Sequence, residues 1–194
     1  MKSDRKPREL PSSSSFSTPH VQSLAGARFL LRLLEEQTAT VVARAADFHA
    51  AGENQDLAYL DGALERQALS EAVQVLSAMV VEGAVNFLGV LVLGGDQFYR
   101  ALERKPIQTK LRETLAAVVW TKEPEYSELM SLVDSLSQAR NSFVHPKPQE
   151  GVPPAREGRG PTFANARQSV AEAVRVLQLL QSVSHVYRVF FHVW

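Results

Sequence analysis

A long apolar run near the middle of the chain places the strongest constraint on its fold. From Val75 to Leu93 nearly every residue is apolar or small, and the polar exceptions are Ser77, Glu82 and Asn86. A helix that is apolar on almost all sides must be covered on most of them. We therefore expect this run to be the second half of a buried helix that spans 61–93, with Asp61 as its N-cap.

The same run is long enough to cross a membrane, which is the alternative interpretation. Glu82 lies within it, however, and a charged residue at mid-span costs roughly 2.5–3.5 kcal/mol on insertion scales. Charged residues also give the preceding residues an amphipathic pattern. A core helix fits both observations better, so we predict no membrane association.

Helical periodicity recurs on both sides of the core helix. Apolar residues repeat at steps of three and four, as one face of a helix requires. Pro106 interrupts a short helix that starts near Gln97, because proline removes a backbone donor. The other expected helices span 21–50, about 109–120, 125–144 and 163–192. With no strand signal, the sequence predicts an all-α protein, an up-and-down bundle of four or five main helices.

Two segments do not fit this helical pattern. Residues 1–20 are rich in proline, serine and charge, and bury too little apolar surface to offset the entropy of ordering, so we expect a disordered tail. Residues 146–161 contain five prolines and three glycines, which predicts a flexible loop. One helical domain, 21–194, contains that loop.

Composition removes several classes of function. The chain has no cysteine, which excludes disulfides and thiolate chemistry and suits a cytoplasmic location. Its histidines are too scattered to predict a metal site, and we expect no cofactor. The 21 basic and 21 acidic residues balance. Any nucleic-acid binding must therefore use a local basic patch.

The segment 138–146 (Gln-Ala-Arg-Asn-Ser-Phe-Val-His-Pro) holds the candidate active-site residues. Arg140 continues an apolar stripe of the helix 125–144, where an unpaired guanidinium is costly; the stripe comprises Leu129, Val133, Leu136 and Phe143. On an unbroken helix Arg140 and His145 would point about 140° apart. Pro146 disfavours helical dihedrals at His145, so its ring is free to turn toward Arg140. Asn141 lies four residues before His145 and is placed to orient it.

A second arginine–histidine pair has the same spacing. Arg44 and His49 lie inside the helix predicted for 21–50. That pair lacks both the neighbouring polar residue and the terminating proline, so its two side chains should diverge. We interpret it as a chance match.

The segment Arg140–His145, at the end of a bundle helix, resembles the motif of the HEPN superfamily. Glu82 and Asn86 resemble a Glu/Asn pair of the long helix in that family. The resemblance implies a metal-independent endoribonuclease in which the 2′-OH of RNA attacks the adjacent phosphate. His145 would act as general acid or base, Arg140 would stabilise the transition state, and Asn141 would orient groups. It also implies a homodimer, and a toxin or defence component restrained by an antitoxin or another regulatory protein.

Two other interpretations remain open. The first is a non-catalytic HEPN-like module that binds RNA, a nucleotide or a protein partner. A helical scaffold that carries an accidental motif is the second. Likewise, Glu82 and Asn86 either support Arg140 and line a cleft or form a buried polar pair that fixes helix packing.

Overall fold

The described part of the chain is all-helical and contains no strand. The computed structural model describes residues 19–118, 124–144 and 160–183. Its helices are α1 (Pro19–Ala50), α2 (Asp56–Leu60), α3 (Ala63–Leu93), α4 (Gly95–Ala101), α5 (Ile107–Ala117), α6 (Glu125–Val144) and α7 (Phe163–Val183). The prediction of an all-α protein is confirmed, whereas the HEPN-type arrangement stays a prediction. The tail 1–18 and most of the loop 146–161 lie outside the described residues.

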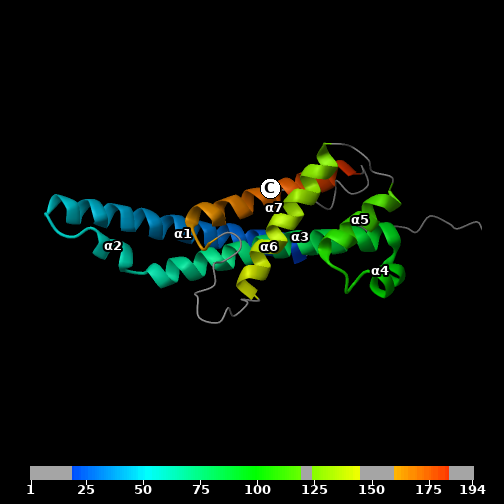
Figure 1. Cartoon of the computed structure of the whole chain (residues 1–194), viewed down its shortest axis with the longest axis horizontal. Coiled ribbons are helices and arrows are strands. Elements are labelled where there is room, and N and C mark those ends of the chain that lie inside the picture. Colours follow the sequence, from blue (N-terminus) through cyan, green and yellow to red (C-terminus); the bar gives the residue numbers. More distant parts are fainter. Residues whose placement is uncertain (1–18, 119–123, 145–159, 184–194) are drawn as a thin grey trace, which may run out of the picture.

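Helix α3 is the axis of the structure. It runs antiparallel to α1, and α2 lies in the connection between them (Figure 1). Helix α7 packs along both long helices, α6 crosses α3 and contacts α7, and α4 and α5 cover the far end of α3 (Figure 1). Helices α1, α4, α5, α6 and α7 all pack against α3, as a helix with apolar residues on nearly all sides requires.

The hydrophobic core is built around the second half of α3. Val81, Val85 and Leu88 are fully buried there. They belong to one cluster with residues from four other helices, including Leu24, Leu111, Leu115, Leu129, Val133, Leu136, Leu177 and Leu180. By length and composition α3 is the one helix among the described residues able to cross a membrane. Its packing inside this cluster confirms the prediction of a core helix.

Several helix boundaries differ from the prediction. Helix α1 starts at Pro19, and His20 is buried with its ring 5.8 Å from that of Phe87. Pro19 and His20 therefore do not belong to the predicted tail. Helix α2 was not predicted. Helix α3 starts at Ala63 after Gly62, whose φ of 64° reverses the chain, and Asp61 does not cap it. The Asp61 carboxylate binds Arg44 of α1 instead.

Close packing between α3 and α4 depends on one glycine. Gly89 is buried in α3, opposite the fully buried ring of Phe98. A Cβ atom at Gly89 would lie 2.3 Å from Cε2 of Phe98. No side chain larger than hydrogen fits there unless the ring moves.

We expect Gly89→Ala to destabilise the fold by about 1–3 kcal/mol, because overpacking outweighs the better helix propensity of alanine. Chemical denaturation measures this change. Gly26→Ala is the matched control: it also lies inside a long helix, but its Cβ would be an ordinary 3.5 Å from Leu76 Cδ1. Gly26→Ala should leave stability unchanged or raise it, and equal losses in both variants would contradict the packing argument.

An ion pair joins α6 to α7 at the surface. Arg175 Nε and Nη2 donate to the two carboxylate oxygens of Glu128 at 2.7 and 2.8 Å. The hydrogen bonds from Arg175 lower the pKa of Glu128. The forked geometry fixes the two helices in register more firmly than a single contact does.

The lowered pKa sets the direction of a pH dependence. Stabilisation by the pair is fully present above pH 4.5, the ordinary glutamate pKa, and is lost as pH falls through the lower folded-state pKa. The stability difference between the wild type and Glu128→Gln should therefore shrink in acid, as measured by denaturation at several pH values. Glu113→Gln, an exposed position on α5, should show no such trend. A difference that grows toward low pH would contradict the assignment.

Candidate functional site

The sequence of α6 places Arg140 at the edge of the core. Leu129, Val133 and Leu136 are buried, as the predicted stripe requires. Arg140 continues this stripe and is half-buried, one turn before the last described residue of α6. The guanidinium thus lies where the apolar core meets solvent.

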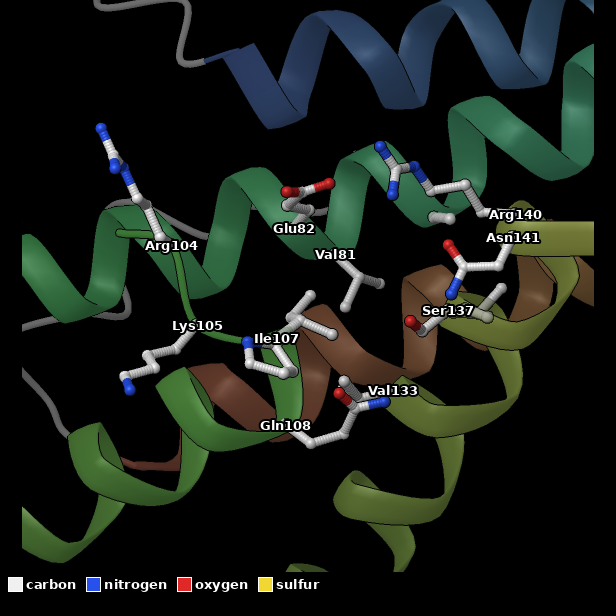
Figure 2. A pocket seen from close by; sticks show the side chains of 13 residues that line it. Val81, Glu82, Arg104, Lys105, Ile107, Gln108, Val133, Ser137, Arg140 and Asn141 are labelled. Atoms are coloured by element: carbon white, nitrogen blue, oxygen red, sulfur yellow. The ribbon is translucent and has the colours of Figure 1, made fainter. Parts of the chain in front are cut away.

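A pocket of about 390 Å³ lies beside Arg140. Three segments build it: α3, the connection from α4 into α5, and α6 (Figure 2). Its floor is apolar and includes Val81, Ile107, Val133 and Leu136. Its polar lining residues are Glu82, Arg104, Lys105, Gln108, Ser137, Arg140 and Asn141.

Cationic residues outnumber anionic ones in the lining of the pocket. Arg104, Lys105 and Arg140 line it, against one carboxylate, Glu82, and the side chains of Arg104 and Lys105 extend away from Arg140 (Figure 2). Because the whole chain is neutral, this excess is the kind of local basic patch that anion binding demands. An apolar floor with a few polar groups around it is also typical of small-ligand sites.

Arg140 and Glu82 point toward each other on the α3 side of this pocket (Figure 2). Neither side chain forms an ion pair or a hydrogen bond with another described residue. The guanidinium therefore keeps its donors available to a ligand, while the nearby carboxylate partly compensates its charge. A guanidinium with available donors can form paired hydrogen bonds with two oxygens of a phosphate.

Asn141 lines the same pocket from the last turn of α6, on the side of Ser137 (Figure 2). His145 follows Val144, the last described residue of α6, and lies outside the described residues. The predicted convergence of His145 with Arg140 stays a prediction. The described lining residues include no histidine.

Glu82 and Asn86 have different surroundings although they share a helix. Asn86 is absent from the described lining of the pocket, and its Oδ1 accepts a hydrogen bond from Lys110 Nζ at 2.9 Å. Lys110 is only 5% exposed, and its ammonium lies 5.8 Å from the ring centre of Phe98. Asn86 therefore holds α5 against α3, which agrees with the alternative that it fixes helix packing. Glu82 lines the pocket, which agrees with the alternative that it lines a cleft beside Arg140.

The second arginine–histidine pair does not form a site. Helix α1 continues through Arg44 and His49 to Ala50. Arg44 pairs with Asp61 and lies over the ring of Phe48, while the side chain of His49 is exposed. Neither Arg44 nor His49 is among the described lining residues of the Arg140 pocket.

Sequence reasoning missed Arg104, Lys105, Gln108 and Ser137 as pocket residues. The only available signal for the first two was a basic dipeptide before Pro106. Nothing in the sequence indicated that this dipeptide would lie near residues more than thirty positions later. Gln108 is held by a hydrogen bond from its Nε2 to Asp134 Oδ1, which ties α5 to α6 beside the pocket.

Neither a metal site nor similarity to a known protein indicates what the pocket binds. Within residues 19–118, 124–144 and 160–183, no group of three or more histidine, aspartate or glutamate side chains is placed to hold a metal ion. No family model, curated protein or solved structure matches this chain.

The different surroundings of Asn86 and Glu82 lead to a stability test. Asn86→Ala leaves the buried ammonium of Lys110 without its acceptor, so we expect a loss of about 1–3 kcal/mol. Glu82→Ala, one turn earlier on the same helix, removes no hydrogen bond between described residues and should change stability by less than about 0.5 kcal/mol. Denaturation curves measure both values. A larger loss for Glu82→Ala than for Asn86→Ala would contradict these assignments.

Proposed function

We propose that the chain is an endoribonuclease of the HEPN type that cleaves RNA without a metal ion. One observation carries the proposal: Arg140, Asn141 and Glu82, chosen from sequence alone, line a single pocket. Two further cations, Arg104 and Lys105, line it as well. The pocket thus combines a donor for the reacting phosphate with positive charge for the flanking backbone.

The proposed reaction is an internal transesterification. A base removes the proton of the ribose 2′-OH, and the 2′-oxygen forms a bond to the adjacent phosphorus. The bond from phosphorus to the 5′-oxygen breaks, and that oxygen takes up a proton. The products are a 2′,3′-cyclic phosphate and a 5′-OH, with no net oxidation or reduction.

Each residue has one role in this scheme. His145 transfers protons, for which an imidazole is suited near neutral pH. Arg140 donates hydrogen bonds to the phosphate oxygens as their charge grows in the transition state. Asn141 orients the imidazole or the substrate. Glu82 faces the Arg140 guanidinium (Figure 2) and partly compensates its charge.

Arg104 and Lys105 serve RNA binding in this proposal. They line the pocket from the α4–α5 connection, away from Arg140, and both are exposed (Figure 2). Exposed cations at the mouth of a pocket contact backbone phosphates without reading the bases. Replacing them should weaken RNA binding and its salt dependence while leaving the chemical step intact.

The biological setting is part of the same proposal. Resemblance to HEPN proteins supports a cytoplasmic homodimer that acts as a toxin or defence component. An uncontrolled ribonuclease harms its own cell, so an antitoxin or another regulatory protein would restrain it.

Cleavage of single-stranded RNA in EDTA tests the proposal. Arg140→Ala should reduce the single-turnover rate by about 10²–10³-fold, the cost of losing one transition-state donor. His145→Ala should reduce it by about 10²–10⁴-fold, the usual contribution of an acid–base group. Analysis of the product ends should detect the cyclic phosphate.

The chain supplies a matched control for these variants. Arg44→Ala and His49→Ala change a pair with identical spacing that does not line the Arg140 pocket, so both should leave the rate unchanged. Activity that survives Arg140→Ala and His145→Ala, or that requires a divalent ion, would contradict the mechanism.

A non-catalytic RNA- or nucleotide-binding module is the second candidate. The observation that favours it is the pocket itself, whose described cations and apolar floor suffice to bind a nucleotide without any histidine. RNA binding that depends on Arg140, Arg104 and Lys105, with no cleavage by the wild type, would establish this candidate in place of the first.

A further inference from the structure

A groove separate from the Arg140 pocket lies between the antiparallel helices α1 and α3, near the end where α2 connects them. It has a volume of about 810 Å³, and none of its lining residues lines the Arg140 pocket. Its apolar lining residues include Leu30, Leu33, Val41, Ala68, Leu69 and Ala72. Within α1 the lining extends from Leu30 to Arg44, which is about 20 Å along the helix axis. A helix of about 14 residues has this length.

Exposed apolar side chains extend the groove. Leu64 is 81% exposed and lies one turn before Ala68, which in turn lies one turn before Ala72, so the three form a row along α3. Leu60 in α2 is 70% exposed, and Leu57 and Tyr59 are exposed beside it. Single exposed apolar residues are ordinary, but a contiguous group beside an apolar groove is typical of an interaction site.

The charge at this end of the molecule is negative. Between residues 45 and 65 the sequence has five carboxylates, Asp47, Glu53, Asp56, Asp61 and Glu65, and no lysine or arginine. Glu36 and Glu65 line the groove without an ion pair to another described residue. The groove's two arginines are occupied: Arg44 binds Asp61, and Arg66 donates to the backbone carbonyls of Asp61 and Tyr59.

From this combination we infer that the α1–α3 groove is a docking site for a basic amphipathic helix of a protein partner. The apolar face of that helix lies on Leu33, Ala68 and Leu69, and its lysines or arginines contact Glu36 and Glu65. The helix-in-groove mode matches the length, the apolar lining and the charge of the groove. This inference does not depend on the proposed ribonuclease activity, because the Arg140 pocket uses different residues.

A designed peptide tests the inference. The probe is a hydrocarbon-stapled helix of about 14 residues with leucines on one face and lysines on the other. One control peptide has the same composition with the leucines distributed around the helix, and another has glutamates in place of the lysines. Fluorescence anisotropy with the full chain should detect the first peptide and give at least about tenfold weaker binding for both controls.

Variants of the groove localise the binding. Ala68→Gln puts a bulky polar side chain on an exposed floor position, and Leu64→Ser removes an exposed apolar one, so neither disturbs the core. Each should weaken binding of the probe by about tenfold, which corresponds to the free energy gained by burying one leucine side chain. Glu65→Gln should weaken it less and reduce its salt dependence. Val42→Ser is the matched control, because Val42 is exposed on α1 but does not line the groove, and it should bind normally.

Several outcomes would overturn the inference. Equal binding of the three peptides, or normal binding by Ala68→Gln and Leu64→Ser, would show that the groove does not receive a basic helix. A dimer in light scattering that dissociates on Leu64→Ser would assign the surface to a second copy of the chain. Binding to phosphatidylcholine or phosphatidylserine vesicles that Leu64→Ser abolishes would assign it to a lipid surface. Circular dichroism of each variant confirms that it is folded.

Discussion

Burial of α3 is the constraint on which the rest of this structure depends. A helix with apolar residues on almost every side is stable in water only when other helices cover it. Helices α1, α5, α6 and α7 each give it part of a common core, and α4 packs closely at Gly89. The order of the helices around α3 in turn decides which polar side chains become neighbours.

The polar residues of α3 show how this works. Glu82 and Asn86 are one turn apart, yet one lines the Arg140 pocket and the other binds Lys110. A polar group on a core helix must either reach solvent or form a hydrogen bond with a partner. Glu82 does the first at the pocket, and Asn86 does the second with Lys110. Asn86 holds α5 through Lys110, and α5 begins just after the connection that contributes Arg104 and Lys105 to the pocket. A structural hydrogen bond thus supports the arrangement of a candidate functional site.

Charge is distributed unevenly along the molecule although its total is zero. The five carboxylates of residues 45–65 surround α2, whereas residues 97–112 carry five lysines and arginines against one glutamate. These segments lie at opposite ends of the long α3 helix (Figure 1). The field of a neutral protein can therefore attract an anion at one end and a cation at the other. Under the two proposals, RNA and a protein partner have separate surfaces on the same chain.

The sequence by itself determined the all-α class, the core helix, the bounds of α6 and the half-buried position of Arg140. All of these follow from local periodicity and from proline and glycine signals, which act within a few residues. It did not determine α2, the start of α3 or the buried position of His20, because Gly62 and the packing against Phe87 decide them. Only the tertiary structure placed Arg104 and Lys105 at the pocket that Arg140 lines, and gave Glu82 and Asn86 different surroundings. Contacts between distant segments depend on how helices pack around a shared core, and periodicity along one helix does not specify that packing.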